Sequence, residues 1–291
     1  MRRLCGALFA FGRGRSLMRL QDALEMVALS DSGVLRGHNE DAVFSDAALG
    51  VAILADGMGG YNAGEVASSM AVSRLSAELG SVIGSCLSET RHGRCDAAVI
   101  ERHIVNEVGA ANFDIFNASR GNPRYSGMGT TLVLAWFYDN RVSVAHVGDS
   151  RVYRLRGESF EQLTRDHSLL QERLDSGLIS REEARHSDYK NLVTRALGVD
   201  PTVDVDISDF DVQPGDLVLL CSDGLNDMVD DHDIAHTLQA LGRNLPLAAE
   251  HLIQLANDNG GRDNISVVLV RVLGDYAAPA GWWQRLLARL K

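Results

Sequence analysis

The stretch Val51–Gly60, VAILADGMGG, constrains this chain more than any other, because an apolar run ends in an aspartate followed by three glycines and a methionine. The run has the length and composition of a buried strand, so Asp56 is delivered to the end of that strand. Gly57, Gly59 and Gly60 permit close approaches that a Cβ would block, and a backbone carbonyl can turn toward whatever Asp56 binds. Taken alone, the pattern also fits an ordinary turn.

The same setting recurs at three other places, where an apolar, strand-like run begins or ends at an aspartate with glycine nearby. Such repetition indicates that the fold brings carboxylates together at one site. Neighbouring carboxylates raise one another's pKa and destabilise the fold unless cations neutralise them. Because oxygen ligands suit hard divalent cations, the sequence predicts a magnesium or manganese site. The residues concerned are Asp56, Asp149, Asp223 and Asp263, with a further acidic cluster at Glu40 and Asp41.

Composition narrows the class of protein. The 291 residues with 45% apolar content allow one large α/β or α+β domain. A formal net charge of -11 argues against nucleic-acid binding, which requires clustered lysine and arginine. No apolar stretch approaches the ~20 residues that a membrane-spanning helix needs. The four cysteines lack a repeated short spacing, which fits a reducing, cytoplasmic location.

Periodicity and turn residues predict the main elements. We expect a strand at the start of Glu25–Gly37, and a hairpin that joins Leu132–Tyr138 to Arg141–Val147 through a turn at Asp139 and Asn140. The charged segment Leu163–Gly198 reads as an excursion from the core. Further predictions are helices at Ala63–Leu79, Ala97–Ala118 and Leu247–Ala256, helical fragments at Leu169–Leu174 and Arg181–Arg185, and strands at Val152–Leu155, Asp216–Cys221 and Ile265–Val272.

Both ends of the chain differ from its centre. The first twenty residues hold five arginines and no acid, so residues 1–23 form a basic leader; it is either disordered or upstream of a true start at Met18 or Met26. Residues 275–291 contain the amphipathic segment AGWWQRLLARLK. Such a segment can rest on a membrane surface, dock on a partner or fold back on the core. These alternatives stay open, and peripheral membrane contact through the termini is one hypothesis.

Six short motifs occur in one order between Glu25 and Val272. They are Arg36-Gly37-His38-Asn39-Glu40-Asp41, Asp56-Gly57-Met58-Gly59-Gly60, Gly127-Met128-Gly129-Thr130-Thr131, His146-Val147-Gly148-Asp149-Ser150-Arg151, Ser222-Asp223-Gly224-Leu225 and Gly261-Arg262-Asp263-Asn264. Any one motif can arise by chance, whereas the ordered set is specific. The set resembles the bacterial form of the type 2C, metal-dependent serine/threonine protein phosphatases.

The resemblance implies an α+β fold over residues 24–274: a four-layer αββα sandwich of two antiparallel β-sheets flanked by helices, with the metals at one end. It implies two Mn²⁺ or Mg²⁺ ions and, in bacterial members, a weaker third. In that arrangement Asp56 bridges two metals and Gly57 offers its carbonyl to one of them. By the same resemblance, Asp223 and Asp263 complete the coordination of the other metal, and Glu40 acts through metal-bound water. Asp149 and Asp223 hold the third metal. Arg36 binds the substrate phosphate, and Asp41 and Asn264 support the site.

The implied chemistry is in-line attack on phosphorus by a water held between the metals, without a covalent intermediate. The eukaryotic pattern has histidine where this chain has Met58, which leaves two candidates for the general acid: a metal-bound water, or His38, which also reads as a plain loop residue. Residues 165–197 align with the flap beside the cleft of bacterial members. That flap either modulates substrate access and the third metal or is a mobile surface insertion.

The function expected from this resemblance is a monomeric serine/threonine phosphatase that opposes a Ser/Thr kinase. A narrower version has it act on a forkhead-associated-domain protein in secretion control. One alternative is a regulatory pseudophosphatase or binding module, which would have lost metal ligands, whereas Asp56, Asp223 and Asp263 are all present. The other is a phosphatase of anti-anti-sigma-type proteins; those members often carry sensor domains, for which we expect no room in this chain.

Overall fold

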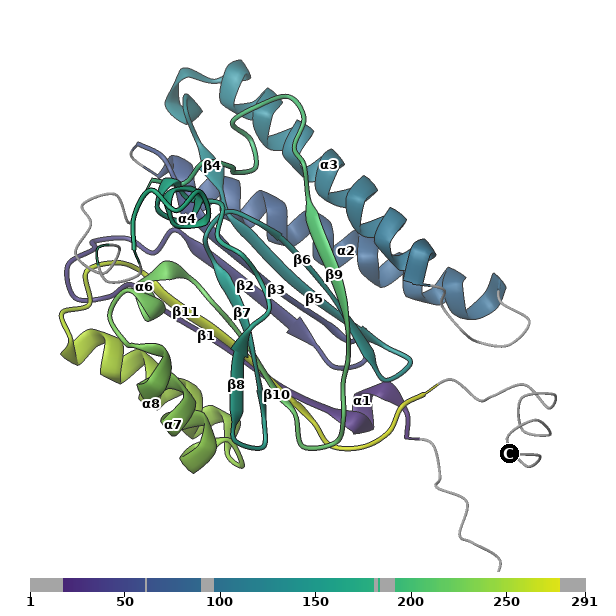
Figure 1. Ribbon diagram of the computed structural model, residues 1–291. Helices are drawn as coiled ribbons and strands as arrows, with labels where there is room; N and C mark the ends of the chain where they lie inside the picture. The colour runs from purple at the N-terminus through teal and green to yellow at the C-terminus, as the bar shows by residue number, and fades with distance from the viewer. Residues whose placement is uncertain (1–17, 61, 90–96, 181–182, 184–191, 278–291) are drawn as a thin grey trace, which may run out of the picture.

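Two antiparallel sheets stack face to face at the centre of the molecule (Figure 1). The computed structural model describes residues 18–60, 62–89, 97–180, 183 and 192–277. One sheet contains, in spatial order, β1 (Leu24–Asp31), β11 (Ile265–Val272), β10 (Leu217–Cys221), β7 (Arg151–Arg156) and β8 (Ser159–Gln162). The other contains β2 (Asp41–Asp46), β3 (Val51–Met58), β5 (Leu132–Tyr138), β6 (Arg141–Val147) and β9 (Asp206–Asp211), and β4 (Gly129–Thr130) pairs with β3.

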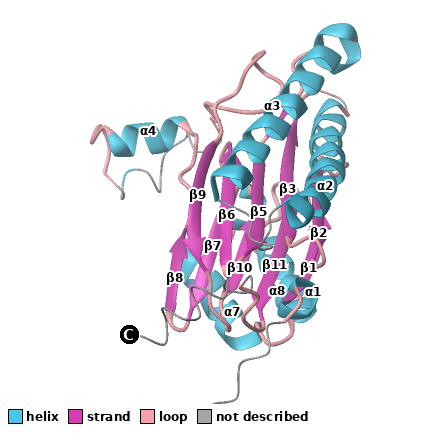
Figure 2. Ribbon diagram, turned by 90° about the vertical axis from the view of Figure 1, so that its right-hand side faces the viewer, coloured by secondary structure: helices cyan, strands magenta, loops and turns pink. Residues whose placement is uncertain are grey.

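Helices cover the outer face of each sheet and complete four layers (Figure 1). The long helices α2 (Ala63–Glu89) and α3 (Ala97–Gly121) lie on the sheet that contains β3. The helices α7 (Asp231–Leu241) and α8 (Leu245–Asp258) lie on the sheet that contains β11. The short helix α4 (Leu169–Asp175) stands away from the strands at the side of the sandwich (Figure 2). The short helical segments are α1 (Leu20–Ala23), η1 (Pro123–Tyr125), α4 (Leu169–Asp175) and α6 (Asp223–Asn226).

Burial on both faces explains why β3 reads as a continuous apolar run. Val51, Ile53 and Ala55 pack in the layer beneath α2 and α3. Ala52 and Leu54, which point the other way, pack in the layer between the two sheets. A strand that is buried on both faces gains stability from apolar residues at every position, so no polar alternation is expected.

The strand β11 has the same double burial on the opposite sheet. Val267 and Leu269 pack with Ile234 of α7 and Leu252 of α8. Val268 points into the layer between the sheets. The α+β sandwich of two antiparallel sheets with flanking helices is therefore confirmed.

Most predicted elements are confirmed close to their expected bounds. The hairpin turns at Asp139 and Asn140, whose φ angles of 44° and 58° are those of the tight two-residue turn that this dipeptide favours. The first helix begins at Ala63 as predicted but continues to Glu89, ten residues beyond its expected end. The predicted fragment at Leu169 is α4.

Two parts of the expectation are corrected. The strand β3 does not stop at Asp56 but runs on to Met58, because Gly57 and Met58 pair with Thr130 and Gly129 of β4. The strands β2, β8 and β9 at the sheet edges, the two-residue strand β4 and the helix α7 escaped prediction. Edge strands are half solvated, and DISDFD in β9 is dominated by aspartate, a residue depleted in strands.

The terminal segments and part of the charged segment fall largely outside the described residues. These are residues 1–17 of the expected leader, 278–291 of the expected tail, and 181–182 and 184–191. Within the leader's range, α1 lies against the inter-sheet core through Leu20 and Ala23. In the described part of the chain, no helix combines the length and the apolar content that crossing a bilayer requires.

Candidate metal centre

One end of the sandwich gathers the carboxylates that the sequence singled out. Asp41 and Asp56 lie directly opposite each other in the pairing of β2 with β3. Asp149 follows β6, Asp223 opens α6 immediately after β10, and Asp263 precedes β11. The segments α4, α6 and β4 lie at this same end (Figure 1). Strands of both sheets therefore deliver acidic side chains to one place.

Burial and mutual repulsion perturb these carboxylates strongly. Burial is the largest cause that raises the pKa of Asp56 well above its usual value, followed by repulsion from Asp41, Asp223 and Asp149. The pKa of Asp223 is raised in the same way, by burial first and then by Asp149. Burial raises the pKa of Asp41 and of Asp149 to about 6. Clustered, desolvated acids of this kind are typical of sites that function requires, because folding alone does not favour them.

Two buried oxygen atoms in this cluster have no hydrogen-bond partner. They are Oδ1 of Asp41 and Oδ1 of Asp223. The other oxygen of Asp41 accepts a hydrogen bond from Ser222 Oγ at 2.9 Å, which ties β2 to the end of β10. A buried acceptor without a partner is costly, and divalent cations bind such oxygens. The residues present therefore fit a magnesium or manganese centre.

Glycine is required beside Asp56 for steric reasons. A Cβ at Gly57 would overlap the carbonyl oxygens of Gly64 and Glu40. A Cβ at Gly64, in the first turn of α2, would lie 2.8 Å from the Glu40 carboxylate. The backbone of Glu40 is held by Gly57 N, which donates to its carbonyl at 3.1 Å, and by Ser68 Oγ at 2.6 Å. This close packing brings Glu40, the Gly57 backbone and the start of α2 together.

Arg36 lies at the rim of the carboxylate cluster. Its NH2 group donates to Asp263 Oδ2 at 2.6 Å, and 53% of the Arg36 side chain is exposed. Asn264 anchors the segment that carries Arg36, because its Nδ2 donates to the carbonyls of Ser32 and His38 at 3.0 and 2.9 Å. The Asn264 Oδ1 accepts from Glu40 N at 2.8 Å. Asn264 therefore joins the segment that carries Arg36 to the backbone of Glu40.

The two threonines that follow Gly129 hold the backbone of Asp56. The Asp56 carbonyl accepts from Thr130 Oγ1 at 2.8 Å and from Thr131 N at 2.9 Å. Asp56 N donates to Thr131 Oγ1 at 3.1 Å, and this hydroxyl also lies 2.7 Å from Ser150 Oγ. Sequence reasoning assigned these threonines no role, although the Gly-Thr-Thr motif was the available signal.

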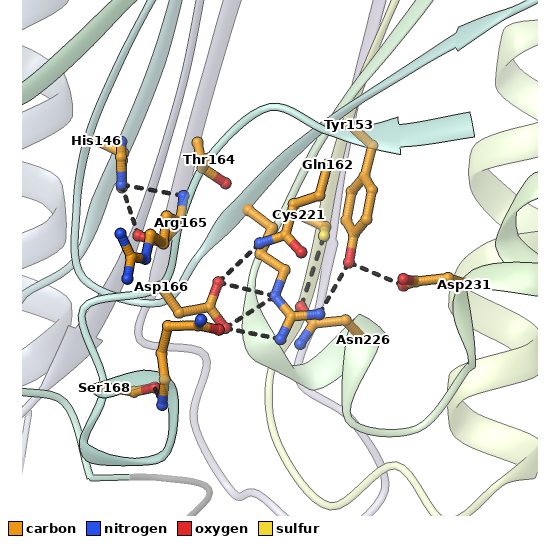
Figure 3. Close-up of polar contacts among 12 residues, drawn as sticks. His146, Tyr153, Gln162, Thr164, Arg165, Asp166, Ser168, Cys221, Asn226 and Asp231 are labelled. Carbon is orange, nitrogen blue, oxygen red and sulfur yellow. Dashed lines mark hydrogen bonds and ion pairs between the residues drawn. The ribbon is translucent and has the colours of Figure 1, made fainter. Parts of the chain in front are cut away.

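A second polar network lies beside the carboxylates and was not predicted. Arg151 Nε and NH2 donate to the two oxygens of Asp166 at 3.0 and 2.7 Å. Gln162 Nε2 donates to the same carboxylate at 2.9 Å (Figure 3). Tyr153 OH accepts from Arg151 NH1 at 2.9 Å and donates to Asp231 Oδ1 at 3.0 Å. This Arg151 network fixes the beginning of the charged segment to β7.

A cavity of about 550 Å³ lies between this network and α4. Asp149 and Asp223 line it on the side of the carboxylate cluster, Asp166 at the root of the charged segment, and Leu170 and Leu174 on α4. The charged segment therefore bounds a space that opens onto the candidate metal centre.

A histidine pair anchors the charged segment on its other side. The rings of His146 and His167 stack with centroids 4.6 Å apart, and His167 Nδ1 accepts from Gly148 N at 3.1 Å. With Asp206 these two histidines form a group whose potential metal-ligand atoms all lie within 4.8 Å of one another. Arg195 NH1 already lies 2.8 Å from Asp206 and 3.2 Å from His167, so this group is satisfied by the chain's own cation.

Comparison with known proteins agrees with this geometry. Residues 36–257 match the Protein phosphatase 2C family. The serine/threonine phosphatase stp of Listeria monocytogenes is 41% identical over 244 residues, which cover 83% of this chain and 93% of that protein. The catalytic domain of PstP, solved in complex with two manganese ions, is 36% identical with a TM-score of 0.73 and covers 86% of this chain and 98% of that one.

A third relative comes from Pseudomonas aeruginosa. PppA, described as a key regulatory component of T6SS, is 31% identical with a TM-score of 0.70 and covers 86% of this chain and 98% of that one. The family match over residues 36–257 includes Asp56, Asp149 and Asp223 and ends before Asp263. This chain therefore belongs to the protein phosphatase 2C family of serine/threonine phosphatases.

Proposed function

We propose that this chain hydrolyses phosphoserine and phosphothreonine in proteins at a centre of two, or three, Mn²⁺ or Mg²⁺ ions. The observation that carries the proposal is the unpartnered, buried Oδ1 of Asp223, a proposed ligand, amid mutually repelling carboxylates. The structure of the relative PstP with two manganese ions supports the choice of metal. Bound divalent cations would supply Lewis-acid activation of the attacking water and charge neutralisation at phosphorus.

The proposed metal ligands divide between the two sheets. Asp56, the Gly57 carbonyl and Glu40 come from the sheet that contains β3, whereas Asp223 and Asp263 come from the ends of β10 and β11. Asp149, which shares the cavity beneath α4 with Asp223, would hold the third ion. Asp41 supports the site through its pairing with Asp56 and its bond to Ser222.

Arg36 is the proposed phosphate-binding residue. Its guanidinium is half exposed and already lies against Asp263, so a phosphate bound at the centre would be in its reach. The planar fork of a guanidinium suits bidentate binding of phosphate oxygens. Arg36 would therefore bind and orient the substrate and stabilise the negative charge that develops on phosphorus.

The proposed substrates are phosphoproteins of a Ser/Thr kinase. The part that the relative PppA has in T6SS supports a narrower proposal, namely a forkhead-associated-domain protein in secretion control. We propose that the phosphatase domain comprises residues 24–274 and that residues 165–197 form a flap, of which the described helix α4 borders the cavity next to Asp149. We propose further that the protein acts as a monomer in the cytoplasm.

Phosphate release from a phosphothreonine peptide, with and without Mn²⁺, tests the proposal. We expect Mn²⁺-dependent turnover in the intact chain and a loss on the order of 10³-fold in both Asp56→Asn and Asp223→Asn, because preorganised electrostatic groups at a reacting centre contribute on that scale. Asp211→Asn is the matched control, since 85% of that side chain is exposed on β9. Turnover that survives in both variants, or that persists in a chelator, would refute the proposed metal centre.

A further inference from the structure

Two large apolar side chains, Val34 and Leu35, project into solvent directly before Arg36. Their exposed fractions are 63% and 69%, and among the large apolar residues in the described ranges only Leu178 is more exposed. Single exposed apolar residues are common, but two adjacent ones next to a functional cation mark a surface that binds something. Folding itself gains nothing from this exposure.

The turn that carries Val34 and Leu35 is held in place by the loop that enters β11. The backbone N–H groups of Val34 and Leu35 both donate to the Gly261 carbonyl, at 2.8 and 3.1 Å. Gly33 has a φ of +74°, and a Cβ there would overlap the carbonyl oxygen of Asp263. Gly33 N donates to Asp31 Oδ1 at 2.8 Å. The two side chains are therefore presented by a pinned turn with a defined conformation.

The same loop, residues 261–263, holds both this turn and the proposed phosphate-binding residue Arg36. Val34 and Leu35 are bound to Gly261, and Arg36 is bound to Asp263 only two residues further along. Consecutive Cα atoms of a substrate are 3.8 Å apart, and Val34 and Leu35 directly precede Arg36, so this turn is the surface next to a phosphorylated residue held at Arg36. The residues that flank the phosphorylated one are thus the natural occupants of this surface.

We propose that Val34 and Leu35 form a specificity surface that binds an apolar side chain next to the phosphorylated residue of the substrate. The inference rests on the proposed phosphatase function. Burial of such a side chain against two aliphatic residues contributes binding in proportion to the apolar area removed from water. An anionic membrane is disfavoured as the occupant, because the chain carries a net charge of -11.

The test uses the full chain with Mn²⁺ and three substrates. Two are phosphothreonine peptides of equal length that differ only in the residues flanking phosphothreonine, leucine in one and serine in the other; the third is a small aryl phosphate without flanking residues. We expect the intact chain to favour the leucine peptide by about five- to tenfold in kcat/KM. Val34→Ala and Leu35→Ala should each reduce this ratio at least twofold, and the double variant should bring it close to one.

Leu247→Ala is the matched control. Leu247 is an exposed leucine in the first turn of α8, and the far end of that helix, about 16 Å away, leads into the loop that holds Val34. This variant should keep the ratio of the intact chain.

Each outcome decides the inference. An intact chain that does not distinguish the two peptides, or a ratio that survives in the double variant, would overturn it. So would an equal loss on all three substrates, because that result would mean that the turn only supports Arg36. If the intact chain turned over none of the three, the proposed function itself would fail, and this inference with it.

Discussion

The two polar clusters at the metal end of the sandwich differ in whether their buried charges find hydrogen-bond partners and an opposite charge within the chain. In the Arg151 network, the Asp166 carboxylate accepts hydrogen bonds from Arg151 and Gln162 and is paired with a full positive charge. In the carboxylate cluster, Asp223 has an unpartnered oxygen and repelling neighbours. Both clusters lie at the same end of the fold, yet only one is complete within the chain.

A cluster that is complete within the chain serves the fold, whereas a cluster that lacks a partner points to a ligand. A buried ion pair with all its hydrogen bonds holds the fold together, and its parts require nothing further. A buried group of like charges with unused acceptors lowers stability and persists only when a ligand compensates for that cost. The contrast predicts opposite responses to mutation and to metal, and three experiments test it.

The largest effect is expected from removing the cation of the satisfied cluster. Arg151→Met leaves Asp166 desolvated without a positive partner, and the free energy of unfolding should fall by about 3 kcal/mol. Urea denaturation measures the change. Arg19→Met is the control, because the Arg19–Asp22 pair is exposed and its loss should produce no measurable change. Adding Asp166→Asn to Arg151→Met should recover part of the loss, and no recovery would show that the charge of Asp166 is not what Arg151 compensates.

Metal binding to the carboxylate cluster should raise the free energy of unfolding. At free Mn²⁺ of a hundred times its dissociation constant, a ligand that binds only the folded state raises the free energy of unfolding by about 2.7 kcal/mol. Denaturation of the chelator-treated protein with and without Mn²⁺ measures this. The rise should be lost in Asp56→Asn and retained in Asp211→Asn. An equal rise in both variants would place the Mn²⁺ site elsewhere.

The sequence predicted the carboxylate cluster but not the Arg151 network, for a physical reason. Asp56 and Asp223 interrupt apolar runs, and that local break is visible in the order of residues alone. Tyr153 and Asp231 are 78 residues apart, and each is unremarkable where it stands in the chain. Double-sided burial likewise made β3 and β11 predictable, whereas the half-exposed edge strand β9 carries no comparable pattern. Long-range pairing is decided by tertiary packing, which local patterns do not encode.

The smallest change in the free energy of unfolding is expected when the same replacement, aspartate by asparagine, is made once in each cluster. It is also the most direct test of the difference between them. In metal-free protein, Asp223→Asn removes a repelling carboxylate next to Asp149, and the free energy of unfolding should rise by about 1 kcal/mol. Asp166→Asn removes a carboxylate that Arg151 and Gln162 both hold, and the free energy of unfolding should fall. Urea denaturation in chelator gives both signs under one condition. If both variants were destabilised alike, Asp223 would be a structural residue in the same sense as Asp166, and the distinction between the clusters would fail.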